Sequence, residues 1–197
     1  MSYTTVEQER ILSVALESIK SFFRSVPFSV PPDWLDDSLF MEFRGTFVTL
    51  TRCGKLRGCI GSILPVRPLW KDISENAVHA AFHDPRFDPL EESELQDLEV
   101  EVSILTTPNL VECDSFQHLS QKIKPFVDGV ILQSGFYKAT FLPQVWEELP
   151  DIDQFFKHLC IKAGLPGNFF LTHFQDLKIH LYQVDRFNQK KCSTKNE

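Results

Sequence analysis

The chain has 197 residues, of which 43% are hydrophobic and 24% are charged, and these values exclude a disordered or collagen-like chain. This length allows one large domain or two small ones. Lys and Arg number 20 against 27 Asp and Glu, so the net charge is −7 and a chain-wide basic surface for nucleic acid or anionic lipid is excluded. No apolar run has the length of a membrane span, and the charged segment 5–10 is unlike a secretory signal.

The cysteines do not form the pattern of a disulfide framework. Their number is odd, their spacing is irregular and no C-x-x-C occurs. The five are Cys53, Cys59, Cys113, Cys160 and Cys192. We therefore expect a cytoplasmic chain with reduced thiols. We expect it to interact with no membrane, and nucleic acid is not an expected partner.

The first predicted element is an amphipathic helix followed by an extended arm. Apolar residues recur at three- and four-residue spacing over 5–23, and Thr4 with Glu7 fits a capping box at the start of this helix. Three prolines within 26–32 prevent the helix from continuing. We interpret that segment as a linker or an extended arm that Trp34 holds against the core.

A β-hairpin and a second helix are predicted next. Residues 43–50 and 56–62 read as strands around a turn in which Gly54 takes the special position. Pro68 opens a helix with an apolar stripe that extends to about residue 83. Asp84 and Pro85 then end this helix.

The remainder alternates short helical and strand patterns with frequent turns. In chain order, the predicted elements are an acidic helix or turn at 90–98, a strand at 99–105, a helix at 115–123, a hairpin of 127–133 and 136–141, helices at 143–149 and 151–163, and a strand at 176–186. This order predicts an α+β protein with mostly antiparallel sheets packed with helices, not a doubly wound parallel sheet.

The segment 56–61 is the first candidate for chemistry. In a strand, Arg57, Cys59 and Gly61 share one face, so that a guanidinium lies beside a thiol. A nearby cation favours the reactive thiolate, and Gly58 and Gly61 allow a ligand to approach closely. The alternative is a buried structural thiol beside an ion-paired arginine.

An ordered series of motifs carries a family resemblance. L-R-G-C-I-G at 56–61 resembles the hallmark of the AMMECR1 family, and other family motifs follow it in order. The further matches are the strand 47–50 before it, the helix 76–81 followed by D-P-R-F at 84–87, the strand 101–105, D-G-V at 128–130, and the blocks 140–145 and 159–165. The resemblance covers about residues 5 to 187 and is greatest to the prokaryotic branch, the protein A type of the AmmeMemoRadiSam system.

This resemblance implies an α+β fold with two subdomains around a cleft. It also implies a single AMMECR1-like domain over 1–187, made of two interleaved subdomains, followed by a polar tail at 188–197. Prokaryotic relatives are associated with MEMO-like and radical SAM proteins, which are the implied partners, but no activity can be carried over. The chain departs from the family pattern at Phe126, where glycine is frequent, and at 167–169, where relatives often have tryptophan.

Asp84 and Arg86 are candidate substrate-binding residues. The planar guanidinium of Arg86 is suited to holding a carboxylate or phosphate. The alternative is an internal ion pair, either between Asp84 and Arg86 or between Arg86 and Glu94, that braces the loop.

The sequence predicts no metal and no cofactor. His79 and His83 are one helical turn apart, but the glutamate of an H-E-x-x-H zinc motif is missing between them. The glycine-rich fingerprints of phosphate- and dinucleotide-binding loops are also missing. A reversible disulfide between Cys53 and Cys59 is conceivable, although hairpin geometry seldom suits one.

Two functions of different classes remain open. In the first, the protein is an enzyme or enzyme component for a small-molecule ligand, with Cys59 as nucleophile or acid/base thiol, Arg57 favouring the thiolate and Arg86 anchoring the substrate. A thioester or thioether step is the simplest chemistry, with His79 or His180 as a possible base. In the second, the protein is a non-catalytic binding module or scaffold for its partner proteins.

Overall fold

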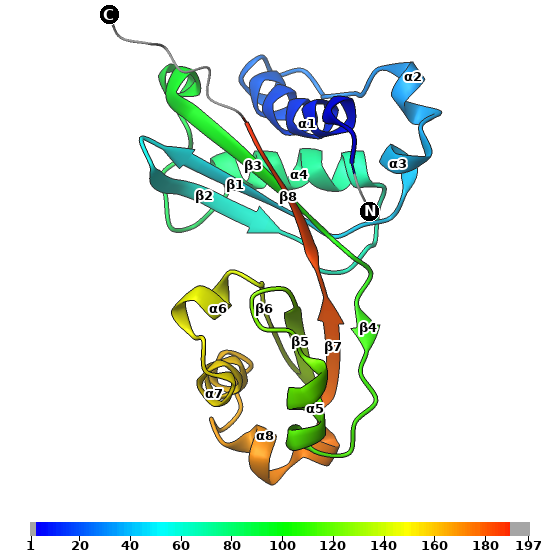
Figure 1. Ribbon diagram of the computed structural model, residues 1–197. Helices are drawn as coiled ribbons and strands as arrows, with labels where there is room; N and C mark the ends of the chain where they lie inside the picture. Colours follow the sequence, from blue (N-terminus) through cyan, green and yellow to red (C-terminus); the bar gives the residue numbers. More distant parts are fainter. Residues whose placement is uncertain (1–2, 190–197) are drawn as a thin grey trace, which may run out of the picture. The chain divides into compact units, whose positions relative to one another are not determined.

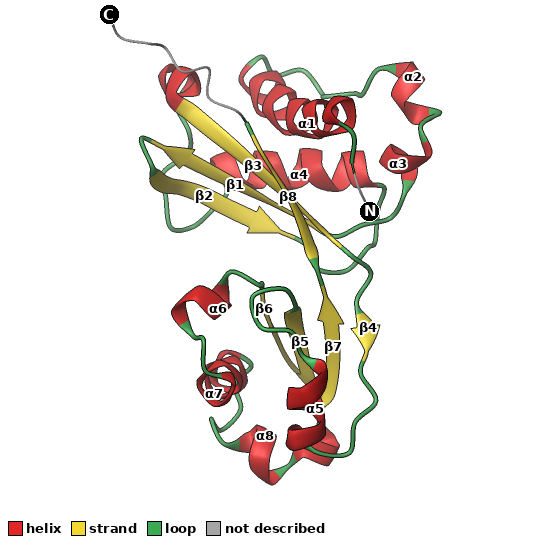
Figure 2. Cartoon of the chain, viewed as in Figure 1, coloured by secondary structure: helices red, strands yellow, loops and turns green. Residues whose placement is uncertain are grey.

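The computed structural model describes residues 3–189, which form two compact units (Figure 1). Of the described residues, one unit contains 3–104 and 185–189, and the other contains Leu105–Val184. Each unit has one four-stranded sheet packed with helices (Figure 2), so the predicted α+β class with antiparallel pairing is confirmed. Within the described range, no helix has both the length and the apolar character needed to cross a membrane.

The first unit has the strand order β2-β1-β3-β8, with β2 at one edge. Its strands are β1 Thr46–Arg52, β2 Lys55–Gly61, β3 Leu98–Leu105 and β8 Val184–Asn188. Its helices are α1 Thr5–Phe23, α2 Pro32–Leu35, α3 Ser38–Met41, α4 Leu69–Phe82 and the short 3₁₀ helix η1 Glu92–Asp97. Helices α1 and α4 lie on one side of this sheet (Figure 1).

Helix α1 agrees with its prediction at both ends. Thr4 and Glu7 form the expected capping box, in which each side chain accepts from the other residue's backbone N–H. The apolar stripe of α1 is buried in the same core as the inward residues of the strands, which include Val48 and Leu50 on β1. Burial of this stripe, which removes apolar surface from water, fixes α1 and α4 on that face of the sheet.

The β1–β2 hairpin has the predicted turn. Cys53 and Gly54 both have positive φ, at 50° and 73°, as a two-residue type I′ turn requires. Across the hairpin, Thr49 lies opposite Cys59. Since side chains alternate along a strand and Val48 and Leu50 face the helices, Thr49 and Cys59 point to the other side. We call this side, marked by Thr49 and Cys59, the outer face.

A buried polar network fastens α4 to the hairpin. Asp72 on α4 is fully buried and accepts hydrogen bonds from Thr46 (2.6 Å), Ser62 (2.6 Å) and Asn76 (3.0 Å). Arg67 donates to the same carboxylate at 2.7 Å. The network satisfies a carboxylate that would otherwise be costly to bury, so the position of α4 on the hairpin is specified by polar contacts as well as apolar ones.

The second unit has the strand order β4-β7-β5-β6. Its strands are β4 Asn109–Leu110, β5 Gly129–Ser134, β6 Tyr137–Phe141 and β7 Lys178–Tyr182. Its helices are α5 Phe116–Lys122, α6 Val145–Glu148, α7 Ile152–Lys162, α8 Phe169–Thr172 and the 3₁₀ helix η2 Phe174–Asp176. The core is aromatic: Trp146 stacks on Phe155 with ring centroids 3.7 Å apart, and both are fully buried.

The late strand predicted over 176–186 is wrong as a single element. The chain forms β7 and then β8, which belong to different sheets, and Gln183 lies between them. Gln183 exchanges hydrogen bonds with Thr106: its N–H donates to Thr106 Oγ1 and its C=O accepts from Thr106 N–H. The alternation that predicted this strand covers Leu177 to Tyr182, which contains β7, and the prediction was extended past its end into β8. Helices α2, α3 and α8 and strand β4 were also not predicted; they have four residues or fewer.

Two predictions fall partly or wholly beyond the described residues. Strand β8 extends to Asn188, so the tail predicted to start at 188 begins with a strand residue. The rest of the tail, 190–197, and Cys192 lie outside the part of the chain that the structure describes.

Candidate functional site

Cys59 lies in the middle of β2 on the outer face. Its Sγ is 3.3 Å from Oγ1 of Thr49 on the neighbouring strand, and the residue is partly buried. Over residues 3–189, no hydrogen bond joins this thiol to a histidine. The predicted bases are therefore not bonded to it, and the Thr49 hydroxyl is the polar group that it contacts.

The peptide groups of Cys59 are held by an ion pair from the loop after α4. Asp84 Oδ2 accepts the Cys59 N–H at 2.9 Å, and Arg86 Nη2 donates to the Cys59 C=O at 3.1 Å. Because β2 is an edge strand, these two groups have no neighbouring strand to bond. Asp84 and Arg86 supply the acceptor and the donor that such a strand would provide. We call this arrangement the edge clamp.

The opposite charges of Asp84 and Arg86 in the edge clamp neutralise each other. Arg86 donates to Asp84 from Nε at 2.9 Å and from Nη2 at 2.6 Å, and the Asp84 side chain is only 2% exposed. These hydrogen bonds from Arg86 are the main reason that the pKa of Asp84 lies well below its ordinary value, against the opposing effect of burial. Of the two predicted ion pairs for Arg86, the structure contains the one with Asp84.

Arg57 is bonded to Glu94 and to the loop that precedes it. Its Nε and Nη2 donate to the two Glu94 oxygens at 2.9 Å each, and Nη1 donates to the Asp88 C=O at 2.9 Å. Hydrogen bonds from Arg57 lower the pKa of Glu94 to about 2. The Arg57 guanidinium, which was predicted to favour the Cys59 thiolate, therefore holds the loop 84–94 in place. The pKa of Arg86 is raised chiefly by its hydrogen bonds to Asp84.

A shallow hollow lies between the two arginines. Its volume is about 460 Å³, and it is lined by Arg57, Pro85, Arg86, Phe87 and Asp88. Arg86 is 54% exposed there, and its guanidinium lies 5.4 Å from the Phe87 ring. A carboxylate or phosphate could reach the Arg86 guanidinium from this hollow, but it would compete with Asp84 for the positive charge.

Packing within the first unit explains why positions 58 and 61 on β2 are glycines. A Cβ at Gly58 would lie 2.1 Å from the Ala80 carbonyl oxygen, so glycine lets β2 approach α4. A Cβ at Gly61 would lie 2.3 Å from the Phe47 ring. Both positions thus require glycine to pack the first unit, whether or not a ligand approaches them.

The other candidate residues remain apart from the thiol. The rings of His79 and His83 are 5.5 Å apart on α4, and no group of three or more potential metal-ligating side chains occurs between residues 3 and 189. Cys53 and Cys59 are free thiols, so the conceivable disulfide between them is not formed. Cys160 is also free; it is fully buried in the second unit, and burial raises its thiol pKa.

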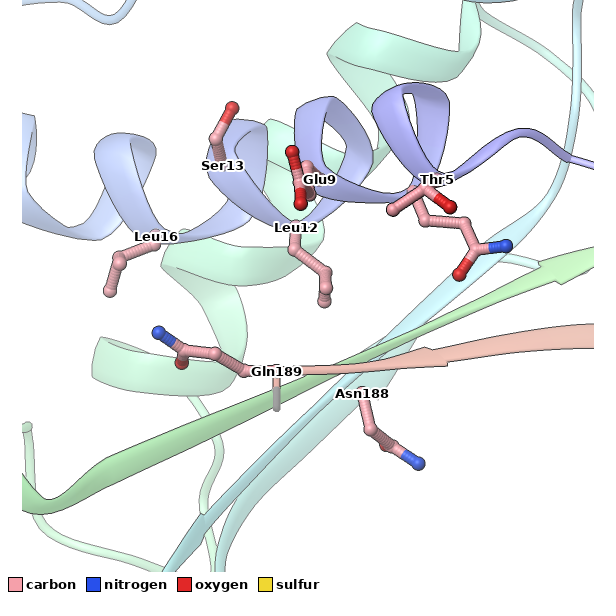
Figure 3. A pocket seen from close by; sticks show the side chains of 8 residues that line it. Thr5, Glu9, Leu12, Ser13, Leu16, Asn188 and Gln189 are labelled. Atoms are coloured by element: carbon pink, nitrogen blue, oxygen red, sulfur yellow. The ribbon is translucent and has the colours of Figure 1, made fainter. Parts of the chain in front are cut away.

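Sequence reasoning missed a second cavity in the first unit. It measures about 350 Å³ and lies between α1 and the end of β8 (Figure 3). Leu12 and Leu16 point from α1 toward the strand, and Gln189 lies opposite them. No local pattern could have revealed it, because its two walls come from opposite ends of the chain. Thr49 was also missed as a partner of Cys59, although strand alternation places it on the outer face.

Comparisons with known proteins agree on one family. The model of the AMMECR1 family matches residues 12–187. A protein of Methanothermobacter thermautotrophicus is 38% identical over 93% of this chain and 94% of its own, and protein MJ0810 of Methanocaldococcus jannaschii is 40% identical over 77% and 76%. The crystal structure of the uncharacterised protein PH0010 from Pyrococcus horikoshii is 34% identical, with a TM-score of 0.81 over 93% of this chain and 91% of that one. The chain belongs to the AMMECR1 family, as its motifs from L-R-G-C-I-G onward indicated.

Proposed function

We propose that the protein acts on a small electrophilic molecule with the Cys59 thiol, as an enzyme or as a component of one. The observation that carries this proposal is the edge clamp: Asp84 and Arg86 hold both free peptide groups of Cys59, at 2.9 and 3.1 Å. A side chain whose backbone is fixed on both sides is pre-organised for reaction or recognition. The four described cysteines are free thiols, which suits the reducing cytoplasm.

The simplest chemistry is acyl transfer. The Cys59 sulfur forms a bond to the carbonyl carbon, the bond from this carbon to the leaving group breaks, and the thiol proton goes to the leaving group. The products are a thioester on Cys59 and the protonated leaving group. Arg86, which borders the hollow, would anchor an anionic part of the substrate, while Thr49 would orient the sulfur at 3.3 Å.

The test is the alkylation rate of each cysteine by iodoacetamide in the native full-length chain, read by peptide mass spectrometry at several pH values. Cys53 is exposed and Cys160 is buried, so they serve as internal references for an ordinary accessible thiol and for an inaccessible one. We expect Cys59 to react faster than Cys53 although it is less exposed. A Cys59 that reacts no faster than Cys53, or only after unfolding like Cys160, would end the nucleophile proposal.

A second candidate function has its own supporting observation. Arg57 and Arg86 are both bonded to internal carboxylates, Glu94 and Asp84, so neither has an uncommitted charge for a substrate. This favours a non-catalytic binding module that acts with MEMO-like and radical SAM partner proteins. Binding of purified partners would then survive Cys59→Ser, whereas the enzyme proposal requires that this substitution abolish turnover.

A further inference from the structure

The sheet of the second unit carries cationic side chains that the proposed function does not use. Gln133 on β5 lies directly opposite Lys138 on β6 on one side and Lys178 on β7 on the other. His180 is two residues after Lys178 on the same strand, so its side chain is on the same face. We call these four residues, Gln133, Lys138, Lys178 and His180, the basic group.

The basic group lies on the side of the sheet away from α5 and α7. The residues that alternate with it, Leu132, Ala139 and Ile179, belong to the apolar core that those helices help to form. Because successive side chains of a strand point to opposite faces, the basic group faces the other way. Its position therefore does not serve the packing of the unit's helices.

The positive charges of the basic group are not neutralised by the protein. Across residues 3–189, no ion pair and no hydrogen bond to a carboxylate involves Lys138 or Lys178, and both residues are exposed. The pKa of His180 is lowered by burial and then by the charges of Lys138 and Lys178, and no carboxylate offsets them.

His180 adds an unpartnered polar atom. Its Nδ1 is buried and has no hydrogen-bond partner among the described residues. A buried polar atom without a hydrogen-bond partner costs stability. A bound anion would offset the positive charges of Lys138 and Lys178 and would favour the charged imidazole of His180.

We propose that the basic group binds the phosphate group of a small molecule. The backbones of β6 and β7 are separated by two strand spacings, roughly 10 Å, and lysine side chains are long enough to converge on one anion above Gln133. A phosphate monoester carries a charge near −2 at neutral pH, which matches two lysines, whereas a carboxylate would neutralise one. The site binds without breaking a bond, and it does not depend on the reactivity of Cys59.

The test is a titration of the full-length chain with inorganic phosphate and with glycerol phosphate, followed by NMR of the His180 ring and the Gln133 side-chain amide. We expect saturable shifts with a dissociation constant of about 1 mM or tighter. We also expect the pKa of His180 to rise on binding, since a nearby anion stabilises imidazolium. Lys138→Gln and Lys178→Gln should each weaken binding about tenfold, which corresponds to roughly 1.4 kcal/mol.

Lys157→Gln is the matched control, because Lys157 is an exposed lysine on α7 of the same unit. It should leave binding unchanged. The proposal is overturned if no saturable shift occurs at His180, or if Lys157→Gln weakens binding as much as Lys178→Gln. Binding of a single-stranded oligonucleotide without binding of glycerol phosphate would overturn the assignment to a small molecule.

Discussion

The Asp84 carboxylate accepts the backbone N–H of Cys59 at 2.9 Å across a sequence separation of 25 residues. With Arg86 on the Cys59 carbonyl, this contact closes the edge of the first sheet at its centre. An open strand edge invites pairing with another chain, so the edge clamp protects β2 while it fixes the backbone of Cys59.

Removing the carboxylate of the clamp should open this edge. In Asp84→Ala the Cys59 N–H loses its acceptor and Arg86 loses its partner, so we expect the free energy of unfolding to fall by about 2 kcal/mol. The Cys59 amide should also exchange its hydrogen faster, as NMR can measure. Asp88→Ala is the control, because Asp88 is exposed in the same loop and its hydrogen bond with Arg57 uses the backbone carbonyl, which alanine retains. Unchanged exchange at Cys59 in Asp84→Ala would show that the clamp does not hold the edge.

The Glu94–Arg57 pair should give the stability a specific dependence on pH. Arg57 lowers the pKa of Glu94 from 4.5 to about 2, so the folded state favours the ionised carboxylate. The contribution of Glu94 to the free energy of unfolding is therefore complete above pH 4.5. This contribution is lost as the pH falls from 4.5 toward 2. Urea unfolding at several pH values should therefore show a weaker loss of stability in this range for Glu94→Gln than for the unsubstituted protein.

Glu92→Gln is the control for this dependence, because Glu92 is exposed on the same 3₁₀ helix. Its pH profile should match that of the unsubstituted protein. Equal profiles for Glu94→Gln and Glu92→Gln would contradict the assignment.

Gly58 should tolerate no side chain. In Gly58→Ala the new Cβ would meet the Ala80 carbonyl oxygen at 2.1 Å, so β2 or α4 must move, and we expect a loss of about 2 kcal/mol. Gly167→Ala is the comparison, because its Cβ would meet the flexible Lys157 side chain at 3.1 Å and should cost less. Urea unfolding measures both. A Gly58→Ala protein as stable as Gly167→Ala would mean that the close approach of β2 to α4 is not required.

Two tryptophans differ in whether the indole N–H has a hydrogen-bond partner. Trp146 Nε1 donates to the Asp128 carbonyl at 2.8 Å, whereas Trp70 Nε1 is buried without a partner among the described residues. Trp146→Phe should therefore lose about 2 kcal/mol of unfolding free energy, and Trp70→Phe should lose less because it removes an unsatisfied donor. Thermal unfolding by circular dichroism compares the two, and a larger loss for Trp70→Phe would refute this reading.

The sequence by itself determined the elements whose signals are local. Apolar periodicity and a capping box predicted α1 with both of its ends, and Gly54 predicted the hairpin turn. Strand alternation also predicted that Arg57 and Cys59 share a face. The register with β1 shifts between Leu50 and Thr51 and pairs Cys59 with Thr49 while leaving Arg57 without an opposite residue, so the pairing does not test this prediction. These features depend on residues a few positions apart, and nearby residues carry that information.

Only the tertiary structure decided which partners the site residues have. Arg57 bonds Glu94, 37 residues away, in place of acting on the thiol, and Asp84 bonds the Cys59 backbone because β2 is the edge strand. The division of 176–186 into β7 and β8 has the same origin, since the two strands pair in different sheets with partners distant in sequence. Strand order and loop paths arise from contacts distant in sequence, which periodicity does not encode, and they determine where each charge finds its partner.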